Sequence, residues 1–365
     1  MTSKSNGSRP DIPGRDRFGG VANSAAGAPE TAGFTTAKVD GKWFLRDPDG
    51  NLFWSVGITG VGNLPATIVT DREHYFESID PNYLGDSKGY KPGSYYHDKK
   101  VKSYALGRKN IERKYGSGAV TNYWRLAAPR LKKWGMNTCG AWSSSGVTSS
   151  GTVPFTDILH STGSEPLKTN RKLYVLWGGI PDYFTPAFET RTLQSAKAHA
   201  LYLGCRLASR NEIVERAAFE ICDVVSYNIY KTSVDAFAPP AGCADKPVII
   251  GEFHIGRIDK GSPYGGLLEV PDAARAAEAY KTYMTSAIKN PHIVGAHWFQ
   301  WFDCFVTGRG DGANATCGFV STLDTPDYAL TDACREISSN LYEIRAGLPS
   351  FILLTLPRAA AERLR

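Results

Sequence analysis

The sequence lacks most of the short motifs that identify cofactor, metal and nucleotide sites. Its seven cysteines include no CxxC pair and no zinc-ligand spacing, so it predicts neither a disulfide framework nor a structural metal. Cys304 and Cys317 bracket a glycine-rich loop and could pair in an oxidising compartment. Neither GxGxxG after the first predicted strand nor GxxxxGK[ST] occurs, which argues against a nucleotide cofactor.

Charge and long apolar runs are also scarce. The formal net charge is only +6, and no Lys/Arg run is interleaved with aromatic residues, so nucleic acid is not the expected partner. No apolar segment is long enough to span a membrane. The start, "MTSKSNGSRPDIPGRDR", has no apolar core of a secretory signal, so the localisation expected from the sequence is cytoplasmic.

What the sequence does contain is typical of a globular enzyme with a large core. It has 365 residues, of which 42% are hydrophobic and 21% charged. Eight Trp and eighteen Tyr supply aromatic faces of the kind on which sugar rings stack, although large cores also use aromatic residues. Composition predicts a flexible segment over residues 1–34, one domain over 35–347 and a tail over 348–365.

Strands alternate with helices along this domain. A hairpin is expected around Asp47–Gly50, followed by an apolar strand over 53–58, and a helix over 122–134 ends at Gly135. Further helices are expected over 211–221 and 271–290. Further strands are expected over 136–142, 153–160, 173–179, 200–208, 222–230, 246–254 and 293–303. The alternation predicts an α/β fold with a parallel sheet, and about eight strands favour a (β/α)8 TIM-type barrel preceded by a short hairpin.

Functional residues are expected at the carboxyl ends of these strands, because those ends meet on one face of a barrel. The run "PVIIG" is apolar without alternation, as in a strand covered on both faces, and it ends in Glu252. A carboxylate at that position is either an active-site group or part of a structural ion pair. The other polar and aromatic residues at strand ends are Trp142, Asn228, Tyr230, His254, His297, Trp298, Gln300, Trp301 and Asp303.

Two chemistries could use this set of side chains. Glycoside hydrolysis needs two carboxylates together with aromatic and amide groups that hold the sugar. Metal-assisted hydrolysis could use Glu252, His254, His297 and Asp303 as ligands, although His297 also suits a hydrogen-bonded core position. The number of tryptophans near the carboxylate favours sugars.

Eight collinear segments between residues 35 and 347 resemble the β-agarase-type barrels of glycoside hydrolase family 50. They are "DGKWFLRDPDGNLFWSVGITGVG", "REHYFESI", "RLKKWGMNTCGAWSSS", "GIPDYFTPAF", "YLGCRLASR", "DVVSYNIY", "PVIIGEFHIG" and "VGAHWFQWFD". The resemblance implies a retaining (β/α)8 hydrolase without a cofactor that cleaves β-galactosidic bonds of agarose-like galactans. It implies that Glu252 is the nucleophile, with a galactan poly- or oligosaccharide as partner. The resemblance would also suit a secreted or periplasmic enzyme, so the localisation stays open. His254, Trp298, Gln300, Asn228, Tyr230 and Trp142 are then expected to bind the sugar.

One part of the family pattern is missing. Such enzymes carry the acid/base as the Glu of an Asn-Glu pair after the fourth strand, but only "ETRTLQSAKAH" separates Phe188 from the next matching strand at Ala200. That is too short for a helix, a strand and a second helix, so the fourth βα unit is expected to be absent. Glu212 and Glu189 are alternative acids. A catalytically impaired galactan-binding protein, or a truncated gene model, is the alternative to an active hydrolase.

Overall fold

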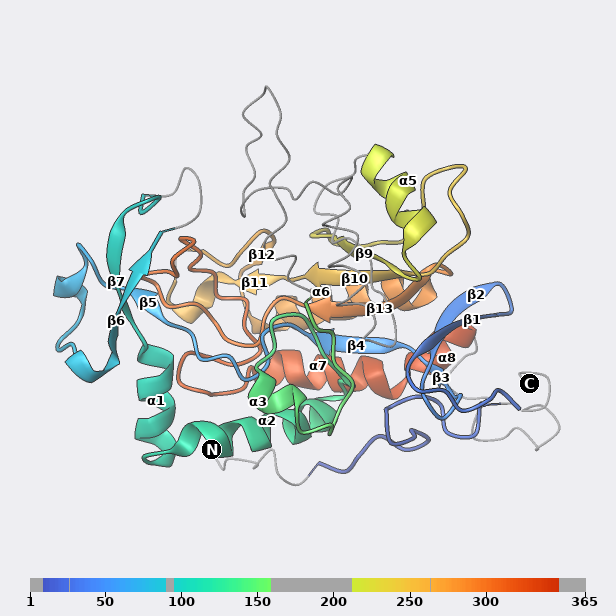
Figure 1. Cartoon of the computed structure of the whole chain (residues 1–365), viewed down its shortest axis with the longest axis horizontal. Coiled ribbons are helices and arrows are strands. Elements are labelled where there is room, and N and C mark those ends of the chain that lie inside the picture. Colours follow the sequence, from blue (N-terminus) through green and yellow to red (C-terminus); the bar gives the residue numbers. More distant parts are fainter. Residues whose placement is uncertain (1–8, 26, 90–94, 159–211, 263, 348–365) are drawn as a thin grey trace.

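A parallel five-stranded sheet lies at the centre of the molecule (Figure 1). The computed structural model describes residues 9–25, 27–89, 95–158, 212–262 and 264–347. The strands of the sheet, in the order β8-β4-β13-β10-β9, are β8 (Thr138–Cys139), β4 (Ser55–Ile58), β13 (Ile293–Trp298), β10 (Val248–Phe253) and β9 (Val225–Asn228). All four neighbouring pairs are parallel. The predicted α/β class with a parallel sheet is therefore confirmed, while within the described residues the sheet does not close on itself.

The two central strands, β10 and β13, have the apolar runs expected of strands that are covered on both faces. Val248, Ile250, Ile293 and Ala296 are at most 1% exposed. Helix α6 (Ala273–Lys289) covers one face, where Phe253 stacks on Tyr283 with ring centroids 4.1 Å apart. These strands therefore form a rigid base for the residues at their carboxyl ends.

Helices surround the sheet, and several begin and end where the sequence predicts. The Asp272 carboxylate caps α6 by accepting the Arg275 N–H, and Gly135 ends α2 in the left-handed conformation at φ 90°. The predicted helices over 122–134, 211–221 and 271–290 are confirmed. The helices other than α6 are α1 (Leu106–Tyr115), α2 (Ala119–Trp134), α3 (Ser145–Thr148), α5 (Glu212–Ile221), α7 (Tyr328–Ser339) and α8 (Leu341–Ala346). No helix in the described ranges has the length and apolar character that crossing a bilayer requires.

Smaller sheets lie at the two ends of the central sheet (Figure 1). At one end, β1 (Thr35–Val39), β2 (Lys42–Arg46) and β3 (Leu52–Phe53) form an antiparallel sheet, which confirms the hairpin at Asp47–Gly50. The elements at the other end come largely from the polar stretch after residue 60, for which the sequence predicts no structure. They are β5 (Thr67–Ile68), η2 (Glu73–Tyr75), η3 (Pro81–Tyr83), β6 (Leu84–Lys88), β7 (Lys100–Tyr104), β11 (Gly256–Arg257), η4 (Ile258–Lys260) and β12 (Glu269–Val270).

Four predicted strands differ or cannot be compared. The strand over 136–142 is reduced to β8, and residues 153–158 make only a single bridge, between Phe155 and Cys139. The strands expected over 173–179 and 200–208, and the gap proposed between Phe188 and Ala200, lie outside the described residues. Cys304 and Cys317 are buried free thiols in the structure and do not form the disulfide considered above.

Residues near the N-terminus pack against the C-terminal helices. The Arg15 guanidinium lies 4.1 Å from the centre of the Tyr342 ring, and it donates to the Ser338 carbonyl at the end of α7. Asp16 accepts the backbone N–H groups of Phe18, Gly19 and Gly20. The segment from Arg15 to Gly20 is therefore held by specific contacts, in a region whose composition suggested flexibility.

Candidate active site

Glu252 lies on β10, one residue before the carboxyl end of the strand, and is only 3% exposed. Its Cα is in register with Asn228, the last residue of the neighbouring strand β9. The strands approach closely here, because a Cβ built on Gly251 would lie 2.6 Å from the Ser226 hydroxyl. The glycine therefore lets β9 and β10 bring a buried carboxylate beside the residues that follow β9.

Two neutral groups in the described part of the chain donate hydrogen bonds to this carboxylate. Asn228 Nδ2 and Tyr230 Oη each donate a hydrogen bond of 2.7 Å to Glu252 Oε2. Both residues were predicted from the sequence to belong to the site, and the structure brings them together with Glu252. Hydrogen bonds from an amide and a phenol fix the position of a carboxylate without cancelling its negative charge.

His254 lies against the ring of Tyr230, with an edge-to-face contact of 4.7 Å between ring centroids. Its Nδ1 donates to the Phe299 carbonyl (3.2 Å), and its Nε2 accepts the Leu267 N–H (2.8 Å). Burial lowers the pKa of His254 to about 4, so the imidazole is neutral at ordinary pH. Both ring nitrogens are bonded to the backbone, and the ring supports Tyr230 from one side.

Trp142 and Gln300 lie near Phe299, the residue that follows β13. The Trp142 indole is 36% exposed and meets Phe299 edge-on at 6.1 Å. The Gln300 side chain accepts from Arg309 Nη1 (3.0 Å) and donates to the Phe302 carbonyl (3.0 Å). Of these two predicted sugar contacts, Trp142 presents an exposed aromatic face, while the Gln300 amide is bonded within its own loop.

The structure places Trp298 in the core instead of at the predicted sugar contact. Its indole is 0% exposed, donates to the Cys317 carbonyl (2.6 Å) and packs against Phe253 and Phe319. The physical reason is that successive side chains of a strand point to opposite faces of the sheet. Trp298 points to the helix-covered face, and His297 points to the opposite face. Trp301 is also fully buried, stacked on Trp134 at 5.1 Å.

The four residues considered as metal ligands do not gather into one site. His297 Nε2 is bonded to the Ser55 hydroxyl (2.8 Å), and burial lowers the pKa of His297 to about 4. Asp303 forms an ion pair with Lys260 at 3.2 Å. Among the residues that the structure describes, no group of three His, Cys, Asp or Glu side chains could hold a metal ion. The arrangement therefore gives the metal-hydrolase reading no support.

The acid/base residue is not identified by the described residues. Glu212 is the first residue of α5, the helix N-terminal position expected from the sequence, and Glu189 lies outside the described part of the chain. Glu215, one turn further along α5, is buried and accepts from the Tyr227 hydroxyl (2.9 Å).

No family model matches the chain, but comparison with curated proteins and solved structures gives a consistent result. The sequence is 25% identical to β-agarase A and 24% identical to β-agarase B of Vibrio sp. (strain JT0107), over 91% and 92% of this chain. The chain covers 48% and 51% of those proteins, about half of their length. The alignment with β-agarase A spans 487 residues, more than the whole 365-residue chain, so the relative contains stretches with no counterpart here.

Solved structures share the fold over most of the chain. An agarase, AgWH50C, superposes with a TM-score of 0.74 at 24% identity, over 92% of this chain and 67% of its own. An exo-β-agarase superposes with a TM-score of 0.75 at 23% identity, over 92% of this chain and 68% of its own. A third structure, PfGH50B, superposes with a TM-score of 0.79 at 22% identity, over 92% of this chain and 69% of its own.

Proposed function

We propose that the chain belongs to the β-agarase family, glycoside hydrolase family 50, and that it is a retaining hydrolase of β-galactosidic bonds in agarose-like galactans. The observation that carries the proposal is the position of Glu252, a buried carboxylate at a strand end held by Asn228 and Tyr230. Retaining glycosidases use one carboxylate as nucleophile and a second as acid/base. We assign the nucleophile to Glu252.

We also propose that the complete sheet is a (β/α)8 barrel. The support is the pairing of β4, the first parallel strand along the chain, with β13, the last one. In a barrel the first and last strands must be neighbours, whereas an open sheet has no such requirement.

The geometry suits the first step of the reaction. The Glu252 carboxylate attacks the anomeric carbon of a galactosyl unit, the bond to the leaving oxygen breaks, and a glycosyl ester forms. Tyr230 and Asn228 hold Glu252 Oε2, so that the carboxylate is oriented before the substrate arrives. Water then hydrolyses the ester. Trp142, with its exposed indole, is the aromatic residue placed to contact the sugar.

A galactan-binding protein with little hydrolytic activity is the second candidate. It is favoured by the short link between Phe188 and Ala200 and by the stretches of β-agarase A that have no counterpart in this chain. A sugar alkoxide is a poor leaving group without a general acid, whose assistance is worth about 10²- to 10⁴-fold. An aryl oxide leaves without that assistance.

Two substrates distinguish the candidates. Turnover of an activated aryl β-galactoside by the 365-residue chain, with agarose cleavage slower by about 10²-fold or more, would indicate a nucleophile without its acid. Ordinary turnover of agarose, about 1 to 10³ per second, would instead show that an acid is present. Glu212→Gln and Glu189→Gln would then identify it. Binding of galactan with no turnover of either substrate would support the second candidate.

A further inference from the structure

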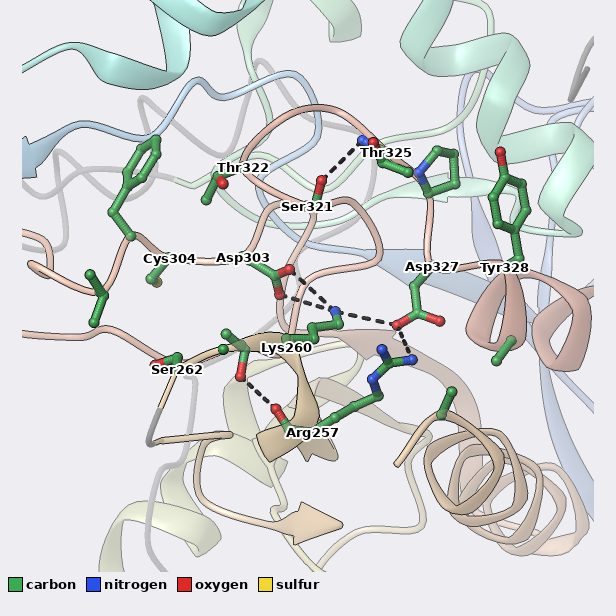
Figure 2. A pocket seen from close by; sticks show the side chains of 17 residues that line it. Arg257, Lys260, Ser262, Asp303, Cys304, Ser321, Thr322, Thr325, Asp327 and Tyr328 are labelled. Atoms are coloured by element: carbon green, nitrogen blue, oxygen red, sulfur yellow. Dashed lines mark hydrogen bonds and ion pairs between the residues drawn. The ribbon is translucent and has the colours of Figure 1, made fainter. Parts of the chain in front are cut away.

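A second cavity opens at the same end of the central sheet as Glu252. It has a volume of about 640 Å³ and lies among η4, the loops that follow β13 and the first residues of α6 and α7 (Figure 2). Its lining includes Arg257, Lys260, Asp303 and Asp327, together with several hydroxyl side chains. The cavity is large enough for a ligand of the size of small organic substrates, for which sites of about 300–1,000 Å³ are usual.

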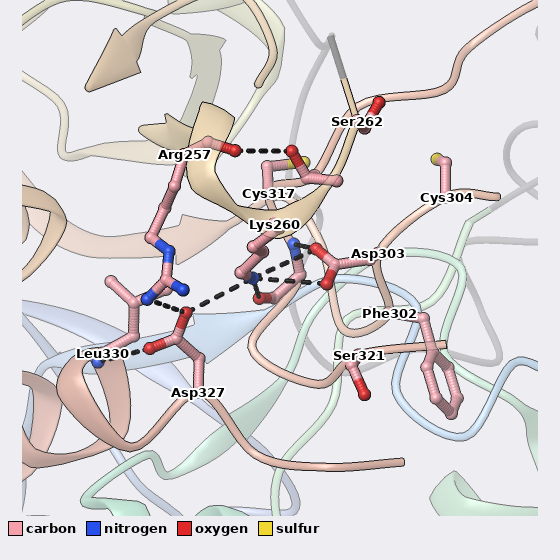
Figure 3. Close-up of polar contacts among 12 residues, drawn as sticks. Arg257, Lys260, Ser262, Phe302, Asp303, Cys304, Cys317, Ser321, Asp327 and Leu330 are labelled. Carbon is pink, nitrogen blue, oxygen red and sulfur yellow. Dashed lines mark hydrogen bonds and ion pairs between the residues drawn. The ribbon is translucent and has the colours of Figure 1, made fainter. Parts of the chain in front are cut away.

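Four charged side chains alternate in sign along one side of the cavity (Figure 3). Arg257 Nη1 lies 3.1 Å from Asp327. Lys260 Nζ lies between the two carboxylates, 3.3 Å from Asp327 and 3.2 Å from Asp303. We call these four residues the charged quartet. Asp303 also accepts the Gly318 N–H (2.7 Å), and Asp327 accepts the Leu330 N–H (3.3 Å) at the start of α7.

The charges of the quartet cancel, which limits the class of ligand. Two cations face two carboxylates, and Asp259 adds a third carboxylate at 2.8 Å from Arg257. A site without net positive charge gives a phosphate or sulfate no long-range attraction. The Lys260 ammonium has no N–H left for a ligand, because it also donates to the Gly318 carbonyl (3.0 Å), but the Arg257 guanidinium has five N–H groups and, among the described residues, is bonded through its side chain to Asp259 and Asp327. This combination suits a neutral ligand with many hydroxyl groups.

The cavity also contains hydroxyls and an aromatic ring. Thr322, Thr325 and Tyr328 line it, and Figure 2 shows Thr325 and Tyr328 beside Asp327. Tyr328 is 49% exposed, although it stands at the start of a helix whose next turns are buried. In the described part of the chain, the side-chain hydroxyls of these three residues have no hydrogen-bond partner. They remain available to a ligand.

The cavity is within reach of a chain bound at Glu252. Arg257, on β11, follows Glu252, on β10, by five positions in sequence. An extended chain spans at most about 3.5 Å per residue, so the Cα atoms of Glu252 and Arg257 are at most about 17 Å apart. A polymer that places one unit at Glu252 can therefore extend to the cavity.

We propose that this cavity is a second carbohydrate site, which binds neutral hexose units of a galactan chain beyond the unit held at Glu252. The inference rests on the proposed function, and it adds a site that lengthens the bound stretch of polymer. Tyr328 supplies the face against which a sugar ring packs, Thr322 and Thr325 supply hydroxyl contacts, and Arg257 hydrogen-bonds the remaining hydroxyls.

Calorimetry with neutral galactan oligosaccharides of increasing length tests this assignment. Glu252→Gln serves as the reference background so that the ligand is not cleaved. In that background we expect affinity to increase with length, and we expect Tyr328→Ala and Thr325→Val each to weaken binding of the long oligosaccharides by about 2- to 10-fold. Binding of the shortest oligosaccharide should not change. Tyr75→Ala is the matched control, because Tyr75 is 65% exposed on η2 and does not line the cavity.

The outcomes distinguish failure of the second carbohydrate site from failure of the proposed function. If the reference binds long oligosaccharides and both cavity variants retain its affinity and length dependence, the cavity is not a carbohydrate site and the proposed function stands. Weaker binding only of sulfated galactans would also overturn the assignment to neutral sugars. If the reference binds no galactan of any length, the proposed function fails, and this inference fails with it.

Discussion

The carboxylates at one end of the central sheet lie in two different environments. Glu252 receives hydrogen bonds from two neutral groups, the amide of Asn228 and the phenol of Tyr230. Asp303 and Asp327 are instead held by the cations of Lys260 and Arg257. Neutral donors orient a carboxylate and leave its charge in place, whereas a cation within 4 Å offsets it. The comparison separates a carboxylate suited to attack an anomeric carbon from carboxylates suited to hold loops together.

The largest expected effect is the loss of turnover in Glu252→Gln. Glutamine keeps the size of the side chain and can still bond to Asn228 and Tyr230, but it cannot form a glycosyl ester. We expect turnover of an activated aryl β-galactoside to fall by about 10³-fold or more. Asp303→Asn is the matched carboxylate control and should retain turnover within about tenfold in a folded protein. If the turnover of Glu252→Gln stayed within about tenfold of the parent's turnover, Glu252 would not be the nucleophile.

The charged quartet should matter mainly for stability. Lys260 is 12% exposed and neutralises two buried carboxylates, so Lys260→Met leaves Asp303 and Asp327 undercompensated. Removing one partner of a buried pair typically costs about 3–5 kcal/mol, and urea unfolding should show a loss of that order. Lys281→Met is the control, because the Lys281–Glu336 pair is exposed and such pairs contribute about 0–1 kcal/mol. Equal losses in the two variants would remove the distinction between buried and exposed pairs.

Tyr230→Phe should reduce catalysis more than stability. The variant removes one hydrogen bond to a charged carboxylate, worth about 1.5–3 kcal/mol, so we expect kcat to fall by about 10- to 100-fold. Tyr227→Phe provides a control within the same segment, since its hydroxyl donates to Glu215 on α5. That control should reduce stability by about 1.5–3 kcal/mol with kcat unchanged within about threefold. A kcat loss of the same size in both variants would mean that Tyr230 acts through folding alone.

A smaller, pH-dependent effect is expected at the N-terminal segment. Burial, followed by the hydrogen bond and charge of Asp16, raises the pKa of Asp47 from 3.8 to about 7. Burial acts in the same direction on Asp16, but hydrogen bonds from Asp47 and from the Gly20, Phe18 and Gly19 N–H groups lower the pKa of Asp16 overall. At pH below about 7 the pair is therefore expected to share one proton.

The sign of the pH effect follows from the raised pKa. The folded state holds the Asp47 proton more tightly than the unfolded chain, so this contribution to stability is complete below about pH 4 and lost as pH rises through about 7. In Asp47→Asn, the amide oxygen can still accept the Asn51 N–H, and the amide NH2 group can donate to Asp16 at any pH. Between pH 5 and 8, the parent should lose about 1–2 kcal/mol relative to the variant in denaturant titrations. Parallel pH profiles would show that the carboxyls do not share a proton.

Local patterns in the sequence predict the central strands and three of the helices. The unbroken run before Glu252 identifies β10, and an apolar periodicity that ends at glycine identifies α2. The positions of Asn228 and Tyr230 beside Glu252 follow from the rule that parallel strand ends meet on one face. These predictions depend on neighbours in sequence, or on one general property of parallel sheets.

Other features depend on contacts between distant segments and could not be predicted in this way. Trp298 and His297 are adjacent in sequence and both are buried, and only the face of β13 decides that Trp298 packs against Phe253 while His297 is bonded to Ser55. The charged quartet joins the loop after β10 to the loop before α7, and no local pattern pairs Lys260 with Asp303 or Asp327. The antiparallel sheet of β5, β6 and β7 has polar strands, one of which is mostly exposed, so its pattern resembles that of a loop.

The most direct test of the central claim is to locate the covalent intermediate. The chain would be incubated with an activated 2-fluoro aryl β-galactoside, whose glycosyl ester hydrolyses slowly, and then analysed by intact-mass and peptide mass spectrometry. The account predicts one added fluorogalactosyl unit on the peptide that contains Glu252, and no adduct in Glu252→Gln. An adduct on a peptide that does not contain Glu252 would contradict it.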